Sequence, residues 1–255
     1  MLRKIQGVLF AVLAVLSFDG NALAAHPLIT DDTGTQGQGK FQLEVNYEYD
    51  HGSADGVMTN VHQLQTTLTY GVIDTVDVVA NFPVLFTKTK ELGETFTANG
   101  LSDLTFEAKW RFFEKDGLSF AAKPGIIVPS GDDERGLGAG EVGFQFYFIS
   151  TYELEPWAFH FNAAYIRNEN NLDERADLWH VSLATELELC KWARAVVNIG
   201  AEGNPDKASD TPPSFIIGGF IFPILENLDL DIGVKGGLTE PEVDYALLAG
   251  LTLRF

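Results

Sequence analysis

Apolar and polar residues alternate with a period of two along most of the chain after residue 40, most completely in the last thirteen residues. One face of this last stretch is apolar throughout, and its members are Val243, Tyr245, Leu247, Ala249, Leu251, Leu253 and Phe255. The opposite face is small, charged or mixed. A period of two is that of a β-strand, in which successive side chains point to opposite faces. The pattern therefore predicts a strand with one apolar face that ends on an aromatic residue.

The same alternation returns along the chain and predicts twelve strands, at residues 40–50, 58–71, 75–86, 102–114, 117–129, 140–151, 154–166, 177–190, 192–202, 213–225, 227–238 and 243–255. A transmembrane β-strand needs about 9–11 residues and is apolar outside and polar inside. The connections alternate between short turns and mostly longer polar gaps, such as residues 87–100. An even strand number with this alternation of turns and loops is typical of bacterial outer-membrane barrels.

We therefore predict an all-β fold, a transmembrane antiparallel up-and-down β-barrel of twelve strands over residues 40–255. The barrel must be closed, because an open sheet edge cannot face lipid. Aromatic residues lie near the predicted strand ends, as interfacial girdles require; they are Tyr47, Tyr49, Tyr70, Trp110, Phe112, Trp157, Trp179 and Trp192. A secreted soluble β-sandwich is the alternative, but it does not predict an apolar face on nearly every strand. The register of residues 213–225 stays open, because both faces of that stretch are apolar.

The first 24 residues have the features of a secretory signal peptide. Arg3 and Lys4 precede a short apolar run at residues 8–16, and Ala22-Leu23-Ala24 fits an A-x-A cleavage site. Residues 25–39 form a lead segment whose turn-forming residues and carboxylates suit neither a strand nor a helix. We expect this segment on the periplasmic side of the barrel or inside its lumen. Export then predicts a location in the bacterial outer membrane, with its lipid as a partner.

Charge excludes one class of partner and limits others. The chain has 17 basic and 36 acidic side chains, a formal net charge of −19. Nucleic-acid binding requires a basic surface, so we expect no nucleic-acid partner. Cys190 is the single cysteine, so no intramolecular disulfide can form. The acidic run Asp132-Asp133-Glu134 is more typical of a solvated loop than of a metal site, and we predict neither a metal nor a cofactor.

A glycine-rich motif at residues 138–143 matches the G-x-G-x-x-G pattern of dinucleotide-binding proteins. That fingerprint requires a strand before it and a helix after it. Here a loop precedes the motif and a strand follows it. We interpret it as a junction between a loop and a strand.

The polar faces of the strands supply the candidate site, because they line the predicted lumen. The candidate lumen and selectivity residues are Glu44, Glu48, Asp77, Glu107, Lys109, Arg111, Lys123, Glu186, Glu188, Arg194, Asp229, Asp231, Lys235 and Arg254. Buried charges must be paired or solvated. The near balance of acids and bases predicts cross-strand ion pairs in a narrow lumen, since twelve strands enclose less space than the 16–18-stranded porins. A filled lumen that only stiffens the barrel is the alternative.

An enzymatic function is the alternative from another class. His160 and Asn162 share one predicted strand face, and His180 and Ser182 share another. An outer-membrane hydrolase of the phospholipase type is also a twelve-stranded barrel. The sequence lacks the local spacing of serine and histidine that is typical of those enzymes, and their catalytic groups face lipid, whereas His160 and Asn162 are predicted in the lumen. We therefore predict that the protein is not an enzyme and that these residues hydrogen-bond to their neighbours.

The lead segment H-P-L-I-T-D-D-T-G-T-Q-G-Q-G-K-F-Q-L-E at residues 26–44, together with the twelve amphipathic strands, resembles a family of outer-membrane transporters. The family is named after the meta-pathway of phenol degradation. The resemblance implies an outer-membrane channel, with hydrophobic or aromatic compounds among the solutes to consider. It implies no catalytic residues. The final strand, which ends at Phe255, resembles the signal by which the outer-membrane barrel assembly machinery recognises its substrates.

The sequence thus predicts a channel that passes small solutes through a narrow, charge-lined lumen. A hydrolase and a non-conducting structural or adhesive barrel are the alternatives.

Overall fold

The fold was analysed in a computed structural model, which describes residues 26–54 and 56–255. The strands are β1 (Phe41–Ala54), β2 (Val57–Ile73), β3 (Val76–Glu91), β4 (Glu94–Leu101), β5 (Leu104–Lys115), β6 (Leu118–Val128), β7 (Gly143–Leu154), β8 (Trp157–Arg167), β9 (Asp177–Cys190), β10 (Ala193–Glu202), β11 (Ser214–Leu225), β12 (Leu228–Gly237) and β13 (Tyr245–Arg254). One turn of 3₁₀ helix, η1 (Asp133–Arg135), lies in the loop between β6 and β7. Within the described residues, no helix has the length and apolar character needed to cross a membrane. The predicted signal peptide lies outside the described residues.

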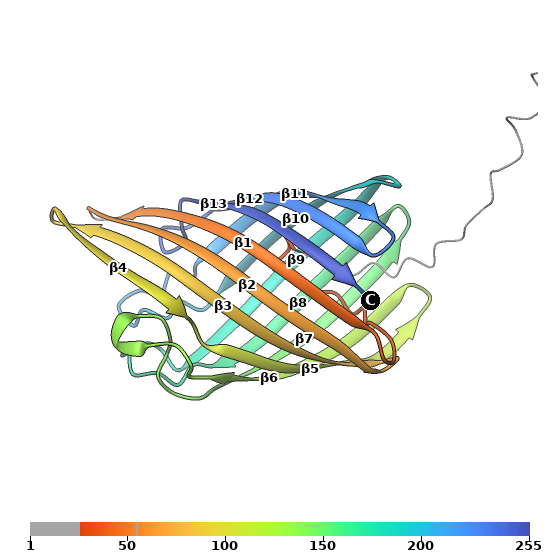
Figure 1. The fold of residues 1–255 in the computed structure, drawn as a ribbon, viewed down its shortest axis with the longest axis horizontal. Coiled ribbons are helices and arrows are strands. Elements are labelled where there is room, and N and C mark those ends of the chain that lie inside the picture. The colour runs from red at the N-terminus through yellow and green to blue at the C-terminus, as the bar shows by residue number, and fades with distance from the viewer. Residues whose placement is uncertain (1–25, 55) are drawn as a thin grey trace, which may run out of the picture.

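The strands form a closed antiparallel barrel of twelve strands, which confirms the predicted fold class (Figure 1). Each strand pairs with its neighbours in the sequence except β4 and β5, which both pair with β3. β13 pairs with β1, and the pairing of β2 with β3 completes the ring. One position in the ring is divided between two strands. The first part of β3 pairs with β5 through residues 76–81, and its second part pairs with β4 through residues 84–91. Thirteen strands therefore occupy twelve positions.

The outer surface of the barrel is apolar, as the alternation predicts. In β13, Tyr245, Leu247 and Leu251 are exposed, whereas Ala246, Leu248 and Thr252 are buried. Most other strands follow the same rule, with exposed aromatic and aliphatic side chains such as Phe144, Phe146, Leu183, Val197 and Ile232. An apolar band around a polar interior is the arrangement of a transmembrane barrel.

The prediction of a long loop at residues 87–100 is wrong. β3 continues to Glu91, turns at Leu92 and Gly93, and returns as β4, so a hairpin extends beyond the rest of the barrel (Figure 1). Leu92 and Gly93 have φ values of 50° and 88°, and positive φ at both central residues is typical of a two-residue type I′ hairpin turn. Threonine is favoured in strands, and the pairing of Thr89 with Phe96 lies within this hairpin. The prediction failed because neither face of this hairpin is consistently apolar.

Two further boundaries differ from the prediction. β1 continues to Ala54, so most of the expected polar gap at residues 51–56 is strand. β7 spans Gly143–Leu154 rather than residues 140–151, which moves its start to the end of the glycine-rich motif. Gly140 instead forms an isolated bridge with Asn170 of a neighbouring loop. The parity of the strand is unchanged, so Phe144 and Phe146 face outward as predicted.

Short two-residue turns join β2 to β3, β5 to β6, β7 to β8, β9 to β10 and β11 to β12. The longer loops lie at the opposite end of the barrel. The end with the short turns also holds the C-terminus, where Phe41 and Phe255 exchange backbone hydrogen bonds of 2.7 and 2.9 Å. The β3–β4 hairpin lies at the same end as the long loops (Figure 1).

Candidate functional site: the barrel lumen

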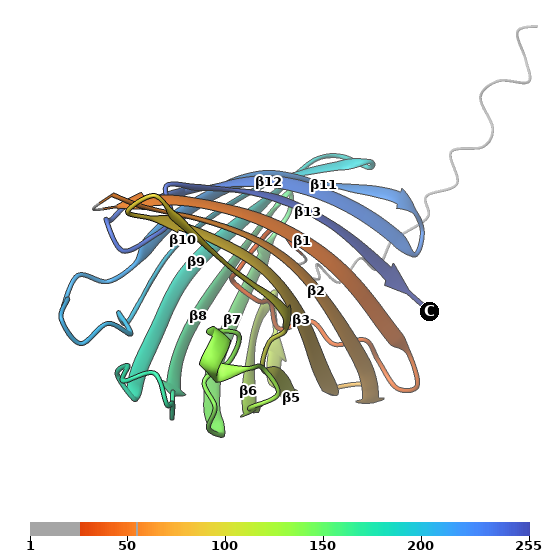
Figure 2. The same ribbon diagram turned by 60° about the vertical axis from the view of Figure 1, so that its left-hand side comes forward.

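Residues 26–39 of the lead segment run inside the barrel before the chain enters β1 (Figure 2). The segment enters deeply, because Thr30 and Asp32 are each 1% exposed. It then returns to the end with the short turns, where the Gly39 amide donates a hydrogen bond of 2.8 Å to the Gly71 carbonyl. The lead segment therefore occupies part of the space that a solute would have to cross.

The barrel wall is shaped to receive this segment. A Cβ atom at Gly233 would lie 2.8 Å from Pro27 Cβ, and one at Gly219 would lie 2.8 Å from Pro27 Cγ. Glycine at these two positions lets Pro27 approach the strand backbones closely. Leu28 packs against the buried side chains of Val196 and Ile221, on the inner face of the barrel. One inward apolar residue of β10 and one of β11 thus contact the lead segment.

Polar side chains of the wall satisfy the backbone of the lead segment. The Asn198 side-chain oxygen accepts hydrogen bonds from the backbone amides of Ile29 and Thr30, at 2.8 and 3.1 Å. Asn162 accepts one from the Asp31 amide at 2.8 Å and donates one to the Asp31 carbonyl at 2.7 Å. A buried backbone polar group is costly when it has no partner, so these contacts compensate for the loss of water around the segment.

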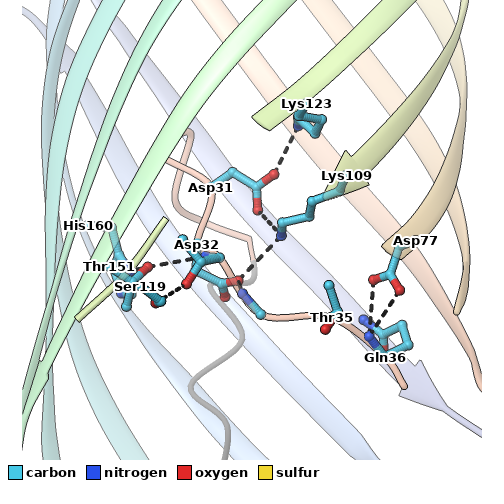
Figure 3. A network of polar contacts seen from close by, with 12 residues as sticks. Asp31, Asp32, Thr35, Gln36, Asp77, Lys109, Ser119, Lys123, Thr151 and His160 are labelled. Atoms are coloured by element: carbon cyan, nitrogen blue, oxygen red, sulfur yellow. Dashed lines mark hydrogen bonds and ion pairs between the residues drawn. The ribbon is translucent and has the colours of Figure 1, made fainter. Parts of the chain in front are cut away.

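Two lysines of the wall hold the carboxylates of the lead segment (Figure 3). Lys109 Nζ lies 2.8 Å from Asp31 Oδ1 and 3.3 Å from Asp32 Oδ1. Lys123 Nζ lies 2.9 Å from Asp31 Oδ2 and 3.3 Å from Glu107 Oε1 on the wall. The lead segment is thereby joined to β5 and β6 by a network of charges. Removing one member would leave its neighbours with fewer counter-ions, which is unfavourable for buried charges.

The two aspartates have opposite electrostatic environments. Burial would raise the pKa of Asp31, but the ammonium groups of Lys109 and Lys123 outweigh burial and hold that pKa well below its usual value. For Asp32, burial dominates and raises the pKa from 3.8 to about 6, although Lys109 opposes the rise. Asp31 is therefore a stable anion, whereas Asp32 changes its charge near neutral pH.

Further ion pairs lie along the other side of the lumen. Arg194 pairs with Glu186 at 2.8 Å and with Asp229 at 3.5 Å. Asp229 also forms an ion pair with Arg254, at 3.0 Å between Oδ2 and Nη1. Charge pairs therefore join neighbouring strands along this side of the lumen wall.

A cavity of about 510 Å³ remains between the lead segment and the inner faces of β1 to β3 and β5 to β8. Amide and hydroxyl groups line one wall and hydrogen-bond to one another. The Gln63 side chain donates a hydrogen bond of 3.1 Å to Gln65, and Thr67 donates one of 2.8 Å to Asn81. This series of hydrogen bonds ends at Glu107, which accepts a hydrogen bond of 3.1 Å from the Asn81 side chain. Pockets for small molecules commonly enclose about 300–1,000 Å³, so this space can hold one. Its lining is predominantly polar.

The candidate residues from the sequence fall into three groups. Those that line the cavity beside the lead segment are Glu44, Glu48, Asp77, Glu107, Lys109 and Lys123. Those that form ion pairs elsewhere in the lumen or at its end are Glu186, Arg194, Asp229, Asp231, Lys235 and Arg254. Two others lie toward the end with the short turns: Arg111 pairs with Glu114 at 3.2 Å, and the Glu188 side chain is exposed.

Sequence reasoning missed the residues of the lead segment that take part in the site. His26 Nδ1 lies 2.5 Å from Asp231 Oδ1, and Asp31 and Asp32 hold the wall lysines. The sequence did contain a signal for their role, namely two adjacent aspartates in a segment without strand periodicity. A pair of carboxylates preceding a barrel with inward lysines can insert as their counter-ions.

The histidines of the lumen make local hydrogen bonds. His160 Nδ1 lies 3.0 Å from Thr151 Oγ1, and His180 Nε2 lies 2.9 Å from Ser182 Oγ. Ser182 Oγ also accepts a hydrogen bond of 2.7 Å from Thr30 of the lead segment. Both histidines and Ser182 are at most 3% exposed. The contacts are therefore those of lumen residues that support the lead segment. Within the described ranges, no cluster of three or more His, Cys, Asp or Glu side chains is arranged to hold a metal ion.

Solved outer-membrane channels have the same fold. An outer-membrane channel from Pseudomonas putida F1 is similar with a TM-score of 0.69 at 15% identity, over 88% of this chain and 98% of that one. The NanC porin gives 0.59 at 7% identity, over 83% and 98% of the two chains. The KdgM porin gives 0.55 at 7% identity, over 83% and 99%. No curated protein matches the sequence. Residues 25–255 match the family described as "Putative MetA-pathway of phenol degradation", and the chain belongs to this family.

Proposed function

We propose that this protein is an outer-membrane channel that passes small solutes through its lumen, and that the lead segment restricts the passage. One observation carries the proposal: a closed barrel with an apolar outer surface encloses a polar lumen in which a cavity remains beside the inserted segment. The likeness of the fold to outer-membrane channels and porins supports this reading. The location in the outer membrane is part of the proposal and follows from the apolar band.

The nature of the solute is a finer question. The description of the family refers to phenol degradation, which makes an aromatic solute one candidate. The cavity lining favours a polar one, since carboxylates, amides and hydroxyls form most of it. A solute that crosses this space exchanges hydrogen bonds with water for hydrogen bonds with the wall. We therefore propose that polar solutes pass more readily than apolar ones.

Narrowing the lumen tests whether it is the conduit. Thr67 is 7% exposed and lines the cavity, whereas the next residue, Leu68, is 39% exposed on the outer face. We expect Thr67→Trp to reduce the single-channel conductance in planar bilayers several-fold, because an indole would fill the cavity. Leu68→Trp, which adds the same side chain on the lipid side, should leave the conductance unchanged.

Heat-modifiable mobility on gels shows whether each variant has folded. Equal conductance of the two folded variants would contradict the assignment of the lumen as the conduit.

A further inference from the structure

The cavity beside the lead segment has more acidic groups than its bases can neutralise. Its lining includes six carboxylates, from Asp31, Asp32, Glu44, Glu48, Asp77 and Glu107. The lysines that line it are two, Lys109 and Lys123. A buried carboxylate without a counter-ion is unfavourable, so the partner of each one decides what the cavity can bind.

Most of these carboxylates have a partner within the protein. Lys109 and Lys123 are shared by Asp31, Asp32 and Glu107, as described above. Asp77 accepts the backbone amide of Gln36 at 3.0 Å. Glu48 pairs with Lys235 at 2.8 Å.

Glu44 has fewer partners than the other five. Like Asp77, it forms no ion pair with any residue in the described part of the chain, but Asp77 accepts the Gln36 amide. Glu44 extends from β1 into the cavity and has neither a counter-ion nor a backbone donor among the described residues.

Unpaired acceptor atoms lie on the same wall. Asp231 is 1% exposed, and its Oδ2 atom has no hydrogen-bond partner in the described part of the chain. The side-chain oxygen of Asn46, which lines the cavity, is also buried without a partner. Both atoms lie within 2.8 Å of the point that a Cβ atom of Gly250 would occupy, and so does His26 Nδ1, which pairs with the other carboxylate oxygen of Asp231. The two acceptors therefore converge on one place beside the His26 ring.

Asp32 lines the cavity from the lead segment, and its Oδ2 atom is a third buried acceptor without a donor. Buried polar groups in native proteins are nearly always hydrogen-bonded, and each exception requires an explanation. Carboxylate oxygens can only accept hydrogen bonds when they are ionised. The missing partners of these atoms are therefore donors, and a positively charged donor would also neutralise the carboxylates around the cavity.

We propose that this cavity is a binding site for a small organic cation with ammonium or guanidinium groups, with Glu44 as its main counter-ion. The inference rests on the proposed function, since it names the class of solute that the channel would select. Glu44 and Asn46 are successive inward residues of β1, about 7 Å apart along the strand. Acceptors at this spacing suit an organic molecule with several donors better than a single metal ion, which needs its oxygens in one tight shell.

Binding to the full-length protein, refolded in detergent, tests the site without requiring conduction. The probe is 1,4-diaminobutane, measured by isothermal titration calorimetry at low ionic strength, with 1,4-butanediol as the uncharged molecule of the same length. We expect the diamine to bind at least tenfold more tightly than the diol. Glu44→Gln should weaken diamine binding tenfold or more and should fold normally, because it removes a buried charge without a counter-ion. Glu226→Gln, which removes one charge from an exposed turn, should bind like the wild type.

Equal diamine affinity of folded wild type and Glu44→Gln would overturn the inference, as would the absence of diamine binding or equal binding of the diol. The outcomes also separate the two proposals. A protein that conducts in bilayers but does not bind the diamine keeps the channel function and loses the cation site. A protein that binds the diamine but never conducts keeps the site and loses the channel function.

Discussion

At the scale of single residues, alternation predicts which side chains face the lumen but not which partners they find there. Lys109 lies in β5, and its partners Asp31 and Asp32 are 78 and 77 positions away in the sequence. Contacts at such separations depend on how the whole barrel closes. The charge on each residue was readable from the sequence, whereas the network was not.

The carboxyl group of Asp32 makes the insertion of the lead segment dependent on pH. It is surrounded by Asp31, Lys109, His160 and Glu186, and burial raises its pKa from 3.8 to about 6. The inserted state therefore holds a proton more tightly than the withdrawn state. As the pH rises from about 4 through 6, that proton is lost and insertion becomes less favourable. We expect the open probability in planar bilayers to be higher at pH 7.5 than at pH 5, by roughly tenfold, since each pKa unit corresponds to a factor of ten.

Asp32→Asn should remove most of this pH dependence, because the amide does not titrate. Asp132→Asn, an exposed loop variant, should retain it. If Asp32→Asn showed the same change of open probability between the two pH values as the wild type, Asp32 would not be the responsible group.

At the scale of elements, the sequence was informative wherever one face of a strand meets lipid. The strands with a continuous apolar face were predicted in position and in parity, β13 most clearly. The β3–β4 hairpin was missed because it extends beyond the rest of the barrel and its faces are mixed. The position of the lead segment could not be decided, because a segment without periodicity contains no sign of the surface that will cover it.

Shortening this hairpin tests whether its outer part is needed for the barrel to close. The ring is already complete where residues 76–81 of β3 pair with β5. We expect that replacing residues 89–96 by a two-residue Asn-Gly turn leaves a folded barrel, with heat-modifiable gel mobility and a Tm within a few degrees of the wild type. Loss of the folded gel form would show that the hairpin is required for closure.

At the scale of the whole molecule, the protein combines two features in one chain: a closed wall and an internal segment held by charges. The wall is shaped around the segment at Gly219 and Gly233, and its asparagines satisfy the segment's backbone. The segment fills part of the lumen and leaves a polar cavity at its side. A lumen of this kind supports the proposed restricted channel, rather than an open pore or a filled barrel.

The most direct test compares the conductance of the full protein with that of a variant lacking residues 26–36, both refolded and checked by heat-modifiable mobility. We expect small or intermittent conductance steps for the full protein. The shortened protein should give steps several-fold larger, because the lead segment no longer occupies its lumen. Equal conductance of the two folded proteins would contradict the restricting role of the segment. Silence of both would contradict the channel itself.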